Sequence, residues 1–164
     1  MNTPLRTDRL DLLPLRVDHA EEMAAVLADP ALHTFIGGSP DTPEALRTRY
    51  EHLVADSPDP AVTWCNWVLR LRADAHLIGT VQATITGHEA AEIAWVVGTP
   101  WQGRGYASEA TRGLVGWLRE RSRVRRVVAH IHPDHHASAA VASAAGLFPT
   151  EEEHDGELRW RLDL

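Results

Sequence analysis

The sequence has no lysine, a single cysteine and no long hydrophobic run. With one cysteine, Cys65, an internal disulfide is excluded, and its place between two tryptophans in a predicted strand favours a packing role. No apolar stretch approaches the roughly 18 residues of a membrane-spanning helix. The amino terminus shows neither a basic start nor an apolar signal core, so we expect a soluble, cytoplasmic protein with no membrane partner.

The sequence also has no excess of positive charge. The 164-residue chain has 23 acidic and 16 basic side chains and a formal net charge of -7. Nucleic-acid binding needs a basic face, so we expect no nucleic-acid partner, whereas an amine or cationic ligand is compatible with this charge. The length is typical of one domain, and we predict a single domain over residues 1–164.

Apolar periodicity predicts a strand followed by two helices in the first sixty residues. Residues 10–15 are typical of a strand at a sheet edge, because Pro14 cannot donate to a central ladder. Asp18 is the predicted cap of a first helix that ends before Asp29. Thr42, followed by a proline, predicts the start of a second helix.

Strands dominate the middle of the chain, and helices alternate with strands after it. Alternating apolar residues predict an antiparallel meander of three strands between Trp64 and Val97. A helix ending near Arg121, a strand over Val124–Ile131, a short helix closed by Gly146 and a final strand or strands follow. Helix-linked strands after a meander imply a mixed sheet, so we predict an α+β fold.

The turn over Gln102–Ala107 lies between a predicted buried strand and an amphipathic helix. Helix amino termini present unpaired N–H groups and the positive end of the macrodipole, and glycine lets that backbone approach a phosphate. We therefore expect an anion site here, with Arg104 and Ser108 as additional contacts. The alternative is that Gly103 and Gly105 merely permit a tight turn. The segment fits neither a Walker loop nor a dinucleotide fingerprint.

The same turn carries a family resemblance. The pattern Q-x-x-G-x-A over residues 102–107 resembles the cofactor motif of the GNAT superfamily of N-acetyltransferases. The longer run Gln102–Ala110 is similar to the branch that contains the ribosomal-protein N-terminal acetyltransferases, and the likeness extends through Glu92–Val97 and Ser138–Leu147. It implies a GNAT-like fold, in which helices flank a mixed, mostly antiparallel central sheet with a splayed pair of parallel strands.

The resemblance also implies an activity, the direct transfer of an acetyl group from acetyl-CoA to a primary amine in a ternary complex. Acetyl-CoA would lie between the splayed strands Glu92–Val97 and Val124–Ile131, with its pantetheine arm paired as an added strand. The acceptor would be a protein N-terminus or a small-molecule amine, and a homodimer is left open. The cofactor-binding residues that the resemblance implies are Trp95, Val96, Val97, Gln102, Gly103, Arg104, Gly105, Tyr106, Ala107, Ser108 and His135.

Glu92 and Ser138 are the candidate catalytic residues. In this family a Glu on the corresponding strand often draws the amine proton through water, and the alternative for Glu92 is a solvated carboxylate that attracts an ammonium group. Many members supply a Tyr to the leaving thiolate, but Ala142 stands at that position. Ser138 could hydrogen-bond the thiolate instead, or simply its own helix backbone. His135 replaces a family Asn and could contact pantetheine or exchange protons, or it is a surface histidine.

The remaining features of the sequence concern metal binding, the specificity for the acceptor and the question of catalysis. The histidines between His130 and His136 match no familiar zinc spacing, so we expect no metal. Acceptor specificity is expected from residues 31–59 and from a late loop over Glu151–Gly156, because loops carry such differences. The missing Tyr and the replaced Asn leave a second hypothesis open, a non-catalytic acyl-CoA-binding sensor or regulatory module.

Overall fold

The computed structural model describes residues 2–87, 89–121 and 123–164. Its helices are α1 (Ala20–Val26), α2 (Pro43–Val54), α3 (Tyr106–Arg119) and α4 (His136–Ala144). Short 3-10 turns are η1 (Val17–His19), η2 (Pro30–His33) and η3 (Thr99–Trp101). The strands are β1 (Leu5–Arg6), β2 (Leu10–Pro14), β3 (Val62–Leu71), β4 (Leu77–Thr86), β5 (Ala90–Val97), β6 (Arg126–Ile131), β7 (Phe148–His154) and β8 (Glu157–Asp163).

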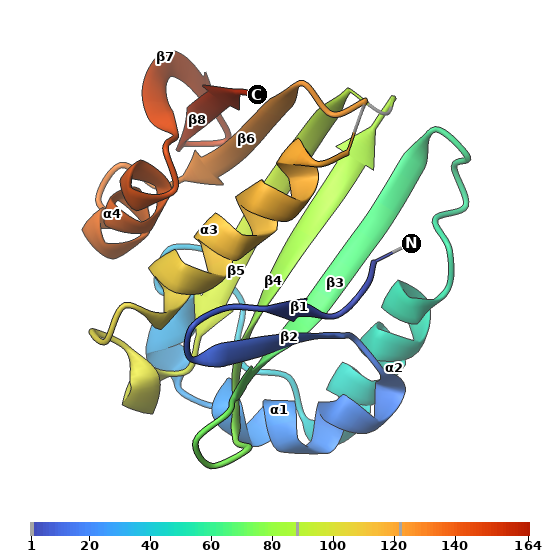
Figure 1. The fold of residues 1–164 in the computed structure, drawn as a ribbon. Helices are drawn as coiled ribbons and strands as arrows, with labels where there is room; N and C mark the ends of the chain where they lie inside the picture. Colours follow the sequence, from blue (N-terminus) through green and yellow to red (C-terminus); the bar gives the residue numbers. More distant parts are fainter. Residues whose placement is uncertain (1, 88, 122) are drawn as a thin grey trace.

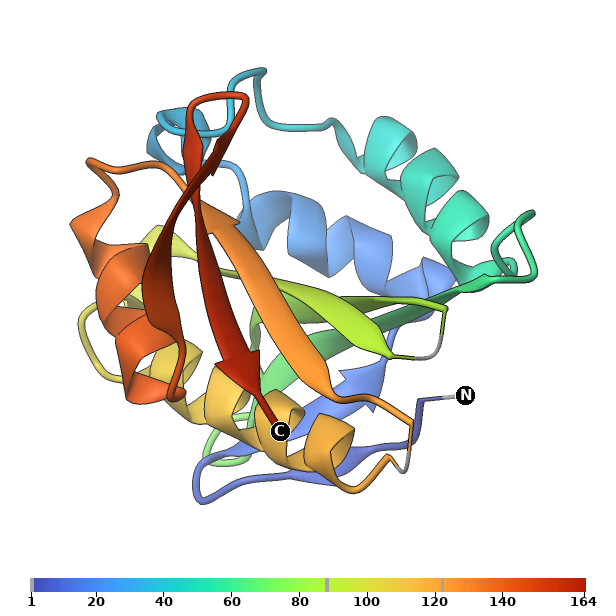
Figure 2. The same ribbon diagram turned by 90° about the horizontal axis from the view of Figure 1, so that it is seen from above.

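The described strands form one eight-stranded sheet in the order β1-β2-β3-β4-β5-β6-β8-β7. Neighbouring strands are antiparallel except β5 and β6, which are parallel. The helices α1 and α2 lie on one face of the sheet and α3 on the other, as the two views in Figure 1 and Figure 2 show. The predicted fold class, a mixed and mostly antiparallel sheet flanked by helices, is confirmed.

Side-chain alternation along β5 assigns its residues to the two faces. Ala91 and Ile93 are buried in the core that also contains the apolar stripe of α3, whereas Glu92 and Ala94 are exposed on the face of α1 and α2. Across the α3 face, the rings of Trp67 and Trp117 meet edge to face with centroids 4.9 Å apart. One face of β5 therefore packs against α3, and the other is partly exposed on the side of α1 and α2.

Two predictions in the first strand and helix are wrong. The strand that contains Pro14 is not the sheet edge, because the two residues of β1 pair with Asp11 and Leu12 on its outer side. Pro14 lies beyond that pairing, at the end of β2, so its missing N–H costs no ladder bond. Asp18 caps no helix, since its carboxylate accepts from Arg16 at 2.9 Å within η1.

The late segment is a strand rather than a loop. Residues 151–154 belong to β7, which pairs with β8 through a two-residue turn at Asp155 and Gly156. Both turn residues have positive φ, 50° and 80°, as tight hairpin turns require. The three consecutive glutamates concealed this strand, because Glu has a low strand propensity and β7 is an edge strand exposed to solvent.

Candidate active site

The parallel strands β5 and β6 separate soon after they begin. Their pairing runs only from Ala90 opposite Arg126 to Glu92 opposite Val128. Beyond Glu92, the edge of β5 that faces β6 has no strand partner in the described part of the chain, and residues 95–97 lie on this edge. Figure 1 shows the two strands diverging from that point. An open edge of this kind can pair with an extended ligand as it would with another strand.

The turn before α3 presents unpaired N–H groups. Gly103 and Gly105 have positive φ, 77° and 82°, and Gly105 is the residue that caps α3. The first N–H with a helical acceptor is that of Glu109, which donates to the Gly105 carbonyl oxygen at 3.0 Å. Among the described residues, the N–H groups from Gly103 to Ser108 find no acceptor. A run of unpaired N–H groups at a helix amino terminus suits a phosphate or pyrophosphate, and we call it the anion cradle.

Gln102 and Arg9 hold this turn in place. The Gln102 side chain donates its Nε2 to the Val97 carbonyl oxygen at 2.9 Å, so it ties the turn to the end of β5 rather than pointing to a ligand. Arg9 donates through Nη1 to the Arg104 carbonyl oxygen at 2.9 Å, and its guanidinium lies 4.3 Å from the ring centroid of Tyr106. Sequence reasoning missed Arg9, which is about a hundred residues away in the chain.

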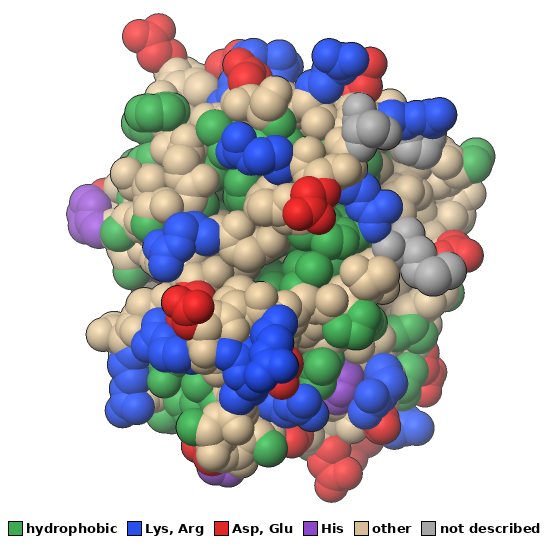
Figure 3. Space-filling view, in the orientation of Figure 1, with side chains coloured by type: hydrophobic (Ala, Val, Ile, Leu, Met, Phe, Trp, Pro, Cys, Tyr) green, Lys and Arg blue, Asp and Glu red, His purple; other side chains and the backbone are tan. Residues whose placement is uncertain are grey.

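Glu109 fixes Arg9 in turn. Its carboxylate accepts from the Thr7 hydroxyl, from the Arg9 backbone N–H at 2.9 Å and from Arg9 Nε at 2.7 Å. Burial raises the pKa of Glu109, but these hydrogen bonds outweigh burial and hold the pKa below its ordinary value. Figure 3 shows arginine side chains gathered over the β1–β2 turn and the start of α3. The anion cradle therefore lies in a locally positive surface of an acidic protein.

Glu92 lies where the two parallel strands separate and has a partner that sequence reasoning did not assign. Its Oε1 is 2.9 Å from Nδ1 of His130, on β6. The Glu92 side chain is 56% exposed and therefore reachable by a substrate, whereas that of His130 is 23% exposed. The contact follows from strand register, because Glu92 pairs with Val128 and His130 is the next residue of β6 on the same face. No local sequence pattern gives that register.

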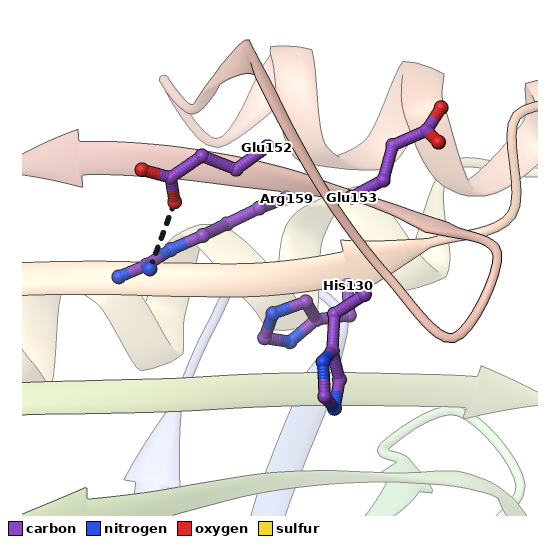
Figure 4. A pocket seen from close by; sticks show the side chains of 5 residues that line it. His130, Glu152, Glu153 and Arg159 are labelled. Carbon is purple, nitrogen blue, oxygen red and sulfur yellow. Dashed lines mark hydrogen bonds and ion pairs between the residues drawn. The ribbon is translucent and has the colours of Figure 1, made fainter.

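A cavity of about 440 Å³ lies beside this pair, under the β7–β8 hairpin. It is lined by His130, Glu152, Glu153, His154 and Arg159. Figure 4 shows that Arg159 reaches Glu152, at 3.0 Å, while the Glu153 carboxylate points away from them. The lining is polar and charged, and one of its two carboxylates is already neutralised.

Ser138 and His135 meet at the start of α4. The Ser138 hydroxyl is 3.3 Å from His135 Nε2, and the His135 ring stacks on Phe35 with centroids 4.5 Å apart. Burial, and then the charge of His132, lower the pKa of His135, so its ring is neutral at neutral pH. His135 is half-buried rather than a surface histidine, and Phe35 was missed because nothing in the sequence links the two segments. Ala142 is fully buried and supplies no polar group.

Metal ligands do not cluster in the described part of the chain. Within residues 2–87, 89–121 and 123–164, no group of three or more His, Cys, Asp or Glu side chains is arranged to hold a metal ion. Histidines of this region have other partners: His130 contacts Glu92, His135 contacts Ser138, and His132 Nδ1 accepts from the Asp134 N–H.

Comparison with known proteins agrees with this geometry. The model of the acetyltransferase (GNAT) domain family matches residues 9–147. The chain therefore belongs to the GNAT acetyltransferase family, the family predicted from the turn before α3. It is an acyltransferase, and its activity is acetyl-CoA-dependent acetylation. No curated protein matches the sequence.

Solved structures share the fold over nearly the whole chain. An acetyltransferase of the GNAT family from Bacillus anthracis superposes with a TM-score of 0.82 at 19% identity and 98% coverage of both chains. RimL, a ribosomal L7/L12 alpha-N-protein acetyltransferase in complex with coenzyme A, gives 0.82 at 17% identity, covering 99% of this chain and 98% of its own. An acetyltransferase from Agrobacterium tumefaciens gives 0.77 at 26% identity, covering 99% and 95%. In the described residues, no helix is long and apolar enough to cross a membrane.

Proposed function

We propose that this chain transfers an acetyl group from acetyl-CoA to a primary amine, with both substrates bound at once and the cofactor held between β5 and β6. The observation that carries the proposal is the open edge of β5, which begins where the parallel pairing ends at Glu92 and leads through Val97 to the anion cradle at the start of α3. The open edge supplies a binding track, the cradle supplies a phosphate site at the Val97 end of the track, and Glu92 supplies a carboxylate at its opposite end.

The cofactor contacts follow from this arrangement. Backbone N–H groups from Gly103 to Ser108 hold the pyrophosphate, and Arg104 adds positive charge beside it. The backbone of residues 95–97 pairs with the amides of the pantetheine arm. When bound, the cofactor supplies a thioester whose carbonyl carbon is attacked by the amine.

Glu92 is the proposed general base. A primary amine is protonated at neutral pH and must lose a proton before it can attack, and a solvent-accessible carboxylate at the end of the strand pairing can take that proton directly or through water. His130 holds the carboxylate at 2.9 Å and orients it. In this role His130 positions Glu92 and does not contact the reacting atoms.

Ser138 is proposed to stabilise the leaving thiolate. If the hydrogen of neutral His135 is on Nε2, the ring donates to the Ser138 oxygen, and the hydroxyl hydrogen is free to point at the sulfur. His135 would then be a positioning residue that also borders the pantetheine path. Ser138 and His135 would together take the role of the family Tyr, whose position is occupied here by the buried Ala142.

The test combines cofactor binding with turnover. Acetyl-CoA should raise the thermal unfolding temperature, and release of free thiol should depend on an added amine. Glu92→Gln should lower kcat/KM for the amine by roughly 100-fold or more at neutral pH while leaving the affinity for acetyl-CoA unchanged. Glu120→Gln, the same change at an exposed residue at the carboxyl end of α3, is the control.

The cofactor site, the acetyl transfer and the role of Glu92 can each be contradicted by a different result. No stabilisation by acetyl-CoA would contradict the cofactor site. Stabilisation without thiol release on any amine would contradict the transfer and favour a sensor. Full activity of Glu92→Gln would remove Glu92 from the mechanism and leave substrate positioning as the main contribution of the protein.

A further inference from the structure

A second cavity, of about 450 Å³, lies on the sheet face opposite α3. Its walls come from the segments around α1, η2 and α2, and its floor comes from β3, β4 and β5. Leucine side chains dominate the walls: Leu15, Leu27, Leu32, Leu46 and Leu53. The volume lies within the range of small-molecule sites, and the apolar lining suits a ligand with a hydrocarbon or aromatic body.

This cavity, which we call the leucine cavity, reaches the proposed base. Ala94 is part of its floor, and Glu92 is the preceding residue of β5 on the same face of the sheet. Residues two apart on a strand are separated by roughly 7 Å, about the length of a short amine chain. A ligand body in the cavity can therefore present an amino group to Glu92 without leaving the sheet surface.

The charge of the leucine cavity restricts what it can hold. All its lining residues lie in the described part of the chain, and none of them is Asp or Glu. Arg49, at its rim, is bound to Asp41 at 3.1 Å. The polar groups on the floor include the neutral amides of Asn66 and Gln82, which are opposite one another on β3 and β4. A second ammonium group would find no carboxylate here and would lose its hydration.

We propose that the acceptor is a primary amine carried on an uncharged, apolar body, and that the leucine cavity binds this body while Glu92 receives the amine. The inference rests on the acetyl transfer proposed above and narrows its substrate class. It separates this acceptor from diamines and polyamines, whose second charge would have to use the polar cavity under the β7–β8 hairpin, where Arg159 already neutralises Glu152.

Matched amines test the proposal. The acceptors are 2-phenylethylamine, a C-terminally amidated tripeptide of phenylalanine followed by two alanines, and 1,4-diaminobutane. At least one of the two apolar acceptors should exceed 1,4-diaminobutane in kcat/KM by roughly 10-fold to 100-fold, the factor expected from burying a phenyl-sized group. A comparison of the free amine with the tripeptide then identifies the source of the amine, a small molecule or a peptide N-terminus.

A charge placed in the cavity should weaken this preference. Gln82→Glu changes an exposed floor residue with little change in shape, and it should lower the ratio of the two kcat/KM values by roughly 10-fold, because the new carboxylate attracts the distal ammonium and disfavours the ring. Thr86→Glu adds the same charge to the same face of β4, outside the cavity, and should leave the ratio unchanged.

Calorimetry with CoA-bound protein supplies a readout that does not depend on turnover. The complex should bind 2-phenylethylamine or the tripeptide more tightly than 1,4-diaminobutane, and Gln82→Glu should weaken that preference. Equal or tighter binding of the diamine, or an unaltered ratio in Gln82→Glu, would overturn the assignment. Those results would leave the acetyl transfer intact, whereas absence of stabilisation by acetyl-CoA would contradict the proposed function itself.

Discussion

At the scale of single residues, Glu109 joins two segments that are far apart in the sequence. Its carboxylate binds the Thr7 hydroxyl and both the backbone and the side chain of Arg9, and Arg9 in turn supports the turn before α3. Because three donors surround this buried carboxylate, its ionised form is favoured over its protonated form. The shape of the anion cradle therefore depends on a charge that does not itself touch the ligand.

Glu109→Gln should destabilise the folded protein by about 2 kcal/mol at neutral pH, because hydrogen bonds to a charged group are lost. The pKa of Glu109 is lowered by folding from the ordinary value of 4.5, so its contribution is full above that value and is lost as the pH falls through the lowered pKa. Urea unfolding near neutral pH and in acid measures the difference in unfolding free energy between the wild type and Glu109→Gln, which should shrink in acid. Glu151→Gln is the control, and a difference that does not change with pH would contradict the assignment.

At the scale of elements, α3 combines a packing face with the proposed phosphate site. Its apolar stripe is buried against the sheet, and its first turn begins at a glycine with left-handed backbone. The stripe follows from 3.6-residue periodicity, and the open N–H groups follow from helix geometry. The element therefore contributes stability along its length and unpaired N–H groups at its amino end, where we propose the phosphate site.

Two alanine substitutions in this element should have opposite effects. Gly105→Ala should cost about 1–2 kcal/mol because φ is 82° there, and it should weaken binding of acetyl-CoA. Gly116→Ala, in the exposed middle of α3 with no atom within 4 Å of the added methyl group, should stabilise by up to about 1 kcal/mol. Thermal unfolding and calorimetry measure both effects. Equal affinities in the two variants would contradict the anion cradle.

At the scale of the whole molecule, the sheet separates two apolar cores. The larger lies between the sheet and α3, and the smaller lies under α1 and α2. Cys65 belongs to the larger core and is 1% exposed, and burial raises the pKa of its thiol. A protonated and enclosed thiol is inert, so it reports on opening of the core.

In the folded protein, Cys65 should react with a thiol reagent only as fast as the core opens. Acetyl-CoA should slow the reaction further, because a ligand of the native state reduces the population of open forms. The measurement is the rate of thiol modification with and without acetyl-CoA, compared with the rate in denaturant. Rapid modification of the folded protein would show that the larger core is not closed around β3.

Much of the fold was predictable because its signals are local. Thr42 caps α2 as predicted, with its hydroxyl accepting from the Ala45 N–H at 3.1 Å, and the three-strand meander and α3 also form where periodicity placed them. The β7 strand was missed because its glutamates conceal an edge position. The support of Glu109, the stacking of Phe35 on His135 and the contact of Glu92 with His130 were missed because each joins distant segments.

The sequence by itself determined the family and the expected cofactor, because the site proposed in the turn before α3 depends on backbone shape, and backbone shape is encoded by neighbouring residues. Only the tertiary structure decided which side chains meet around that turn and around Glu92. It also decided that apolar walls without a carboxylate lie next to the proposed base. Such surroundings depend on strand register and helix packing, which bring together residues that no local pattern connects.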